Sequence, residues 1–156
     1  MRRIIPAITA LALFAFAACA GASGPNIPQD ATIALDREPV TTAAYVGTTQ
    51  SISLQVINQG RHALTISSVA LLAADGGSSP LLDGGGPFSS PQFSDPLPAQ
   101  VPGLGTSFVS ITYKPNKPGR TTAVLSIESD AKARPHLMAE VSGCAVALDA
   151  GVDSGC

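Results

Sequence analysis

Residues 51–56 read Ser-Ile-Ser-Leu-Gln-Val, and this alternation of polar and apolar side chains decides the fold class. Successive side chains of a β-strand point to opposite faces of its sheet. One face would therefore carry Ile52, Leu54 and Val56, and the other would carry Ser51, Ser53 and Gln55. The segment predicts a strand that is buried on one face only.

The same period of two returns in residues 64–71, 107–113, 121–128 and 136–142. In the first of these we expect a β-bulge, because Leu64 and Ile66 differ in parity from Val69 and Leu71. Residues typical of turns separate the segments, as in 58–60, 115–119 and 130–135. No segment shows a sustained helical period, so we predict an all-β protein built as an antiparallel sandwich.

Residues 73–105 differ from the rest because they are rich in Gly and Pro and poor in β-branched side chains. Central strands exclude Pro, so this insert predicts a long loop with at most one irregular edge strand, around Phe88 to Phe93. We expect both Phe side chains to cover the end of the core.

The N-terminus is typical of an export signal. Arg2 and Arg3 precede an apolar run from Ile4 to Ala18 that is too short to span a bilayer permanently. Residues 16–19 (Phe-Ala-Ala-Cys) resemble a bacterial lipobox, which predicts a lipoprotein signal peptide over 1–18 and acylation of Cys19. Cleavage after Ala20, which would release a secreted protein, is the alternative. Residues 19–30 would then form a flexible tether, and 147–156 a C-terminal tail.

Cysteine usage agrees with export. Once Cys19 is acylated or removed, Cys144 and Cys156 are left as a pair in an oxidising compartment, and a disulfide between them is predicted. The alternatives are two unpaired thiols or pairing with another chain.

The charge balance disfavours a nucleic-acid partner. The chain has 9 basic and 11 acidic residues, and loss of Arg2 and Arg3 leaves 7 against 11, a net charge of −4. A nucleic-acid-binding surface needs the opposite excess.

The order of the fragments resembles a known family. Residues 56–60 (Val-Ile-Asn-Gln-Gly) precede Leu64-Thr65-Ile66, and later Tyr113-Lys114-Pro115 precedes a run from Gly119 to Asp130 and a last strand ending at Gly143. Over residues 31–146 this order resembles the ASH or hydin-type domain, called choice-of-anchor D in bacterial surface proteins. The insert, and Tyr113 where the family commonly has Phe, are departures. The resemblance implies an immunoglobulin-like β-sandwich of about seven strands that serves as an interaction or spacer module without catalytic residues or cofactor.

Both histidines and three basic side chains are predicted to lie at one end of the sandwich. His62 follows the strand of 51–56 and His136 opens the last strand, so the topology places both beside Arg61, Lys132 and Arg134. We interpret these five residues as an interaction patch, which the tether could turn toward anionic lipid head groups. A hydrolase triad is disfavoured because the sequence has no Gly-x-Ser-x-Gly elbow. A zinc site with the two histidines would need a third ligand, for which only Asp130 is a candidate.

We therefore expect an exported protein anchored in the cell envelope, at the outer membrane, through acylated Cys19. Its sandwich would serve adhesion, scaffolding or binding of an envelope or extracellular protein, without catalysis. A periplasmic chaperone-like module is the first alternative, and a hydrolase or metal-dependent enzyme is the second.

Overall fold

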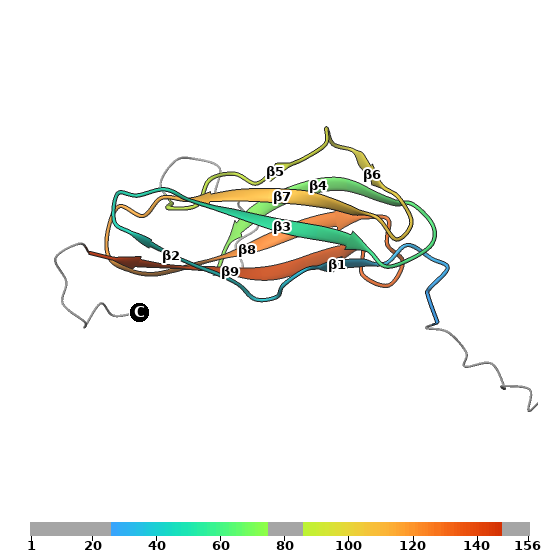
Figure 1. Cartoon of the computed structure of the whole chain (residues 1–156), viewed down its shortest axis with the longest axis horizontal. Coiled ribbons are helices and arrows are strands. Elements are labelled where there is room, and N and C mark those ends of the chain that lie inside the picture. Colours follow the sequence, from blue (N-terminus) through green and yellow to red (C-terminus); the bar gives the residue numbers. More distant parts are fainter. Residues whose placement is uncertain (1–25, 75–85, 148–156) are drawn as a thin grey trace, which may run out of the picture.

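Two β-sheets make up the part of the chain that the computed structural model describes, residues 26–74 and 86–147 (Figure 1). The strands are β1 (Ile33–Leu35), β2 (Val40–Tyr45), β3 (Gln50–Asn58), β4 (Leu64–Ala73), β5 (Gln92–Phe93), β6 (Ala99–Val101), β7 (Thr106–Tyr113), β8 (Gly119–Ser129) and β9 (His136–Val146). The predicted all-β class is confirmed. None of the described residues forms a helix long and apolar enough to cross a membrane.

The strand order is that of an immunoglobulin-like sandwich. One sheet has the order β1-β3-β7-β5, and the other has the order β2-β9-β8-β4-β6. All ladders are antiparallel except the one between β2 and β9, which is parallel. The chain leaves the first sheet at Leu35 and joins the second at Val40, so residues 36–39 carry it across the edge of the sandwich.

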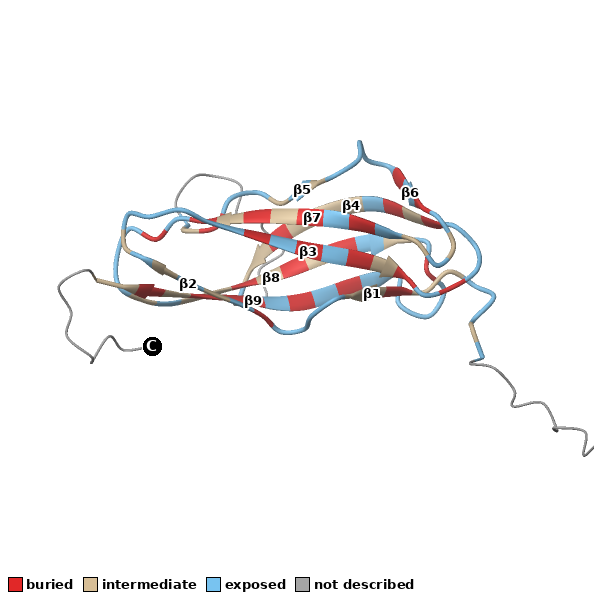
Figure 2. Ribbon diagram, viewed as in Figure 1, coloured by how far each residue is buried: buried red, intermediate tan, exposed pale blue. Residues whose placement is uncertain are grey.

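The core lies between the sheets and follows the alternation of the sequence (Figure 2). On β3 every second side chain from Ile52 is buried, and the predicted inward set of β7, β8 and β9 is buried as well: Val109, Ile111, Tyr113, Ala123, Leu125, Ile127, Leu137, Ala139 and Val141. The predicted bulge in β4 is present, as a register shift between Ile66 and Ser68.

The Gly/Pro-rich insert supplies an edge strand to each sheet, where at most one was predicted. β5 pairs with β7 and β6 pairs with β4. Both strands are too short for a period to be read from the sequence. Phe88 is buried, and its ring centroid lies 4.8 Å from that of Tyr113, while Phe93 packs partly buried against the core.

Tyr113 and Gly143 bring the two sheets into close contact. A Cβ at Gly143 would lie 2.4 Å from the Tyr113 ring, so only glycine leaves room for that ring. Burial raises the pKa of Tyr113, and the nearby Thr121 hydroxyl lowers it by a smaller amount. The two hydroxyls are close to each other but do not reach hydrogen-bonding geometry. The Tyr113 hydroxyl thus has no hydrogen-bond partner among the described residues.

Candidate interaction site

Asn58 organises the end of the sandwich that carries the predicted patch. Its side chain is fully buried, and its Nδ2 donates to the carbonyls of His62 (2.8 Å), Val101 (3.2 Å) and Pro102 (3.1 Å). Its Oδ1 accepts from the amides of Thr32 (3.3 Å) and Gly60 (3.0 Å). A single amide therefore joins three separate stretches of chain at this end, and satisfies main-chain groups that would otherwise be buried without partners.

The turn after β3 is bound to the segment that precedes β1. The amides of Arg61 and His62 donate to the carbonyls of Pro28 (3.0 Å) and Gln29 (3.1 Å). The approach is close, since a Cβ at Gly60 would lie 1.9 Å from the carbonyl oxygen of Asp30. Residues 28–30, which the sequence assigned to the tether, thus lie against the sandwich, and the tether over 19–30 stays a prediction.

Asp30 lies between two side chains of the patch, Lys132 and His62. Its carboxylate is 2.9 Å from the Lys132 ammonium and 4.0 Å from Nδ1 of His62. The hydrogen bond from Lys132, followed by the charge of Lys132, lowers the pKa of Asp30. The loop between β8 and β9 is thereby attached to the start of the described chain.

Two more patch residues, Arg134 and His136, also face carboxylates. Both terminal nitrogens of Arg134 lie 3.4 Å from the carboxylate oxygens of Glu38, and Arg134 also donates to the Met138 carbonyl (3.4 Å). Nδ1 of His136 is 3.9 Å from Glu128, its cross-strand neighbour on β8. All of these side chains are well exposed, so each pair contributes little to stability.

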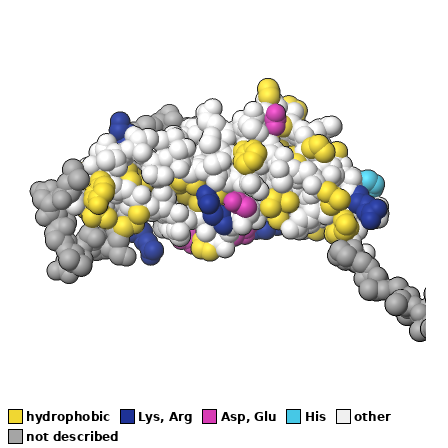
Figure 3. Space-filling view, in the orientation of Figure 1, with side chains coloured by type: hydrophobic (Ala, Val, Ile, Leu, Met, Phe, Trp, Pro, Cys, Tyr) yellow, Lys and Arg dark blue, Asp and Glu magenta, His cyan; other side chains and the backbone are white. Residues whose placement is uncertain are grey.

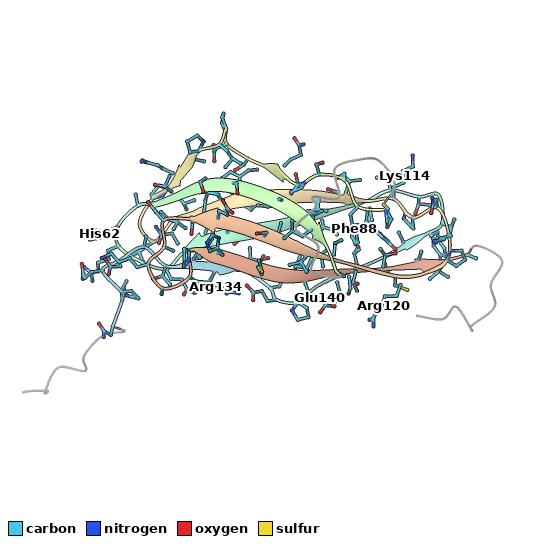
Figure 4. All side chains as sticks on the ribbon, turned by 180° about the vertical axis from the view of Figure 1, so that it is seen from behind. His62, Phe88, Lys114, Arg120, Arg134 and Glu140 are labelled. Atoms are coloured by element: carbon cyan, nitrogen blue, oxygen red, sulfur yellow. The ribbon has the colours of Figure 1, made fainter. Side chains whose placement is uncertain are left out.

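The structure brings the predicted patch residues to one end of the molecule. His62 and Arg134 lie at the end opposite Lys114 and Arg120 (Figure 4), and Figure 3 shows His and basic side chains together at the right-hand end of the molecule. Sequence reasoning missed the carboxylates of Asp30, Glu38 and Glu128. These three carboxylates lie opposite His62, Lys132, Arg134 and His136. These carboxylates would weaken the predicted contact with anionic lipid.

The side chains weighed for metal binding and catalysis have structural partners. Asp130, the candidate third zinc ligand, accepts from the Thr65 amide (2.8 Å), and its own amide donates to the Thr65 carbonyl (3.1 Å). This pair continues the β4–β8 ladder. Within residues 26–74 and 86–147, no group of three or more His, Cys, Asp or Glu side chains is arranged to hold a metal ion.

The predicted cysteine sites fall mostly outside the described residues. Cys144 lies in β9 and is disulfide-bonded. Cys19 and Cys156 are not among the residues described, so the acylation of Cys19 and the pairing of Cys144 with Cys156 stay predictions.

A pocket of about 390 Å³ lies toward the opposite end, where β2 ends. Its lining is mostly apolar and comprises Ala43, Ala44, Tyr45, Thr48, Gln50 and Val146. Tyr45 is 54% exposed at its rim. The sequence did not point to this pocket, because it forms only where β2 and β9 lie side by side.

Comparisons with known proteins find likeness in structure alone. No family model and no curated protein matches the chain. The ASH/PapD-like domain of human CEP192 (PapD-like domain 7) is similar with a TM-score of 0.52 at 16% identity, covering 91% of this chain and 99% of that one. A Porphyromonas gingivalis protein of unknown function is similar with a TM-score of 0.56 at 13% identity, covering 78% of this chain and 50% of that one.

The Vibrio cholerae protease VesB is similar with a TM-score of 0.54 at 11% identity, covering 72% of this chain and 31% of the protease. Identities this low establish the fold and leave function to be argued from residues. The chain therefore has an immunoglobulin-like sandwich of the ASH/PapD-like type.

Proposed function

We propose that this chain is an exported envelope protein, anchored through acylated Cys19, whose sandwich binds another protein without catalysing a reaction. The observation that carries the binding role is the ASH/PapD-like sandwich itself, with its polar side chains paired at the surface. The lipobox-like residues 16–19 support the anchor.

The described part of the chain begins at the end of the sandwich that carries the patch (Figure 1). An anchor at Cys19 would therefore turn Arg61, His62 and Lys132 toward the membrane. The pocket beside β2 would then face away from the bilayer, where an envelope or extracellular partner can reach it.

The anchor is tested by mass spectrometry of the mature N-terminus, with Cys19→Ser as the matched variant. We expect the wild-type chain to begin at an acylated Cys19 and to sediment with membranes. The Cys19→Ser protein should lack the lipid and leave the membrane fraction. A mature chain that begins at Gly21 would contradict the anchor.

Protein binding is tested by cross-linking in intact cells, followed by identification of the attached chains. We expect one partner to be recovered reproducibly from the envelope. Metal analysis and a broad hydrolase screen of the purified protein serve as controls for the enzymatic alternative. A bound metal with hydrolase activity would overturn the non-catalytic role.

The chaperone-like alternative fits the same fold, and the fate of the partner separates the two roles. A chaperone would hold its partner unfolded and release it to another site, whereas a scaffold or adhesin would hold a folded partner. Limited proteolysis of the cross-linked partner distinguishes these states, because an unfolded chain is cleaved much faster.

A further inference from the structure

The edge of β2 that faces away from β9 carries unpaired main-chain groups. The Val46 amide donates to the Val146 carbonyl (2.9 Å) across the parallel ladder. Alternate residues of a strand direct their main-chain groups to opposite edges. Thr42 and Ala44 therefore bond to β9, while Thr41, Ala43 and Tyr45 face the open edge.

Of the groups on this open edge, only the Tyr45 carbonyl has a partner in the described chain. It accepts from the amide (3.0 Å) and the hydroxyl (2.7 Å) of Thr48. The N–H and C=O groups of Thr41 and Ala43, and the N–H of Tyr45, make no hydrogen bond to any residue described.

The other three strands at the ends of the sheets are shorter than β2. β1, β5 and β6 have only three, two and three residues. The edge of β3 beyond β1 is covered by side chains, because Arg37 donates to the Ser53 carbonyl (2.7 Å) and Asp36 accepts from the Gln55 amide (2.9 Å). Short strands and charged side chains are the usual protection against pairing with another chain.

β2 has neither form of protection. It runs for six residues, reads Val-Thr-Thr-Ala-Ala-Tyr, and contains no charge, proline or bulge. The pocket of about 390 Å³ adjoins its open edge, with the small side chains of Ala43 and Ala44 leaving the space that Tyr45 borders.

We infer that the open edge of β2 binds an extended, uncharged segment of a partner protein, which adds a strand to the sheet and places an aliphatic side chain in the adjoining pocket. This inference rests on the proposed protein-binding function and locates its site. Main-chain hydrogen bonds supply affinity in this mode, and the pocket supplies specificity. An extended backbone is the ligand that matches the unpaired groups of Thr41 and Ala43, and the mostly apolar lining selects an aliphatic side chain.

The inference is tested by titrating the full mature protein with a capped peptide of eight alternating Thr and Val residues. We expect amide NMR shifts at Thr41, Ala43 and Tyr45, and slower hydrogen exchange at Thr41 and Ala43. The same peptide with every amide nitrogen methylated keeps its side chains but cannot donate a hydrogen bond to the open carbonyls of Thr41 and Ala43. It should bind at least about tenfold more weakly.

Ala43→Pro is the sharpest variant, because it removes an N–H that the fold itself does not use. Ala43→Lys leaves the backbone intact and puts a charge at the pocket, and it covers the case in which the Pro variant fails to fold. Both should bind the peptide at least about tenfold more weakly than wild type. Met138→Lys, at an exposed position on the neighbouring strand β9, is the matched control and should bind like wild type.

Equal peptide affinity in Ala43→Lys and Met138→Lys, or shifts confined to other amides, would overturn the inference. So would a wild-type dimer in sedimentation that Ala43→Lys abolishes, since a second copy would then occupy the edge. If cross-linking in cells recovers a partner that Ala43→Lys still holds, the β2 site fails while the proposed function stands. If the peptide binds at β2 but cross-linking recovers no envelope partner, the β2 site stands and the proposed function fails.

Discussion

At the scale of single residues, Asn58 has the greatest effect on how the patch end is built. Five hydrogen bonds connect its amide to the segment before β1, to the turn after β3 and to the residues after β6. Both the oxygen and the nitrogen of the side-chain amide form hydrogen bonds, so neither Asp nor Leu can replace Asn58. An Asp would lose the donors, and a Leu would leave buried main-chain groups without partners.

Replacing Asn58 by Ala should therefore lower the free energy of unfolding by about 2 to 4 kcal/mol. Chemical denaturation followed by circular dichroism measures the change. Asn116→Ala, in the exposed turn before β8, is the control and should shift stability by no more than about 0.5 kcal/mol. Equal stabilities of the two variants would mean that water replaces the lost bonds at position 58.

The sequence marked Asn58 as part of a turn and no more. Its neighbours along the chain, Gln59 and Gly60, are typical of turns. Its partners at Val101 and Pro102 lie more than 40 residues away. A period read along one strand reports which face is buried, but it cannot report which distant carbonyls meet a buried amide. The same limit hid Asp30, Glu38 and Glu128 from the predicted patch.

At the scale of elements, the segment before β1 is held to the β8–β9 loop by Asp30 and Lys132. Because the pKa of Asp30 is lowered in the folded protein, the pair stabilises folding above the unfolded value of 3.8 and is lost as the pH falls through the lower, folded value. The free energy of unfolding of Asp30→Asn should therefore change less between pH 5 and pH 2 than that of wild type.

Denaturation series at both pH values measure this difference. Asp95→Asn is a useful comparison, because Asp95 accepts from Ser94 and Ser107 and has no ion pair with any basic side chain of the described residues. Identical pH dependence in wild type and Asp30→Asn would show that Lys132 does not hold this segment in solution.

Long strands were predictable and short ones were not. β3, β7, β8 and β9 alternate over enough residues for one face to be recognised. β2 was missed because Val-Thr-Thr-Ala-Ala-Tyr does not alternate between polar and apolar side chains, although the strand forms the parallel ladder with β9. β5 and β6 form by pairing with β7 and β4, and the sequence of two or three residues cannot indicate this pairing.

At the scale of the whole molecule, the acidic residues of the patch end should reduce the affinity of the protein for anionic membranes. With Asp30, Glu38 and Glu128 opposing Arg61, Lys132 and Arg134, we expect the Cys19→Ser protein to bind vesicles with and without anionic lipid equally weakly. Replacing the three carboxylates by their amides raises the charge of this end by three and should strengthen binding to anionic vesicles by at least about tenfold.

Vesicle sedimentation measures this binding, with added salt as the control for screening. Anionic vesicles that bind the Cys19→Ser protein strongly, and lose it when Arg61, Lys132 and Arg134 become Ala, would contradict the expectation. The sequence located the basic residues of the patch correctly. It could not show their net effect, because two of the opposing carboxylates come from residues 30 and 38, far from the basic loops along the chain.

The parallel ladder between β2 and β9 determines how the molecule would carry a load. The two ends of the described chain leave from opposite ends of the sandwich (Figure 1). Tension between them would draw β2 and β9 past each other along their length. All the hydrogen bonds of that ladder would then have to break together rather than one after another, so the sandwich would resist stretching between its two ends.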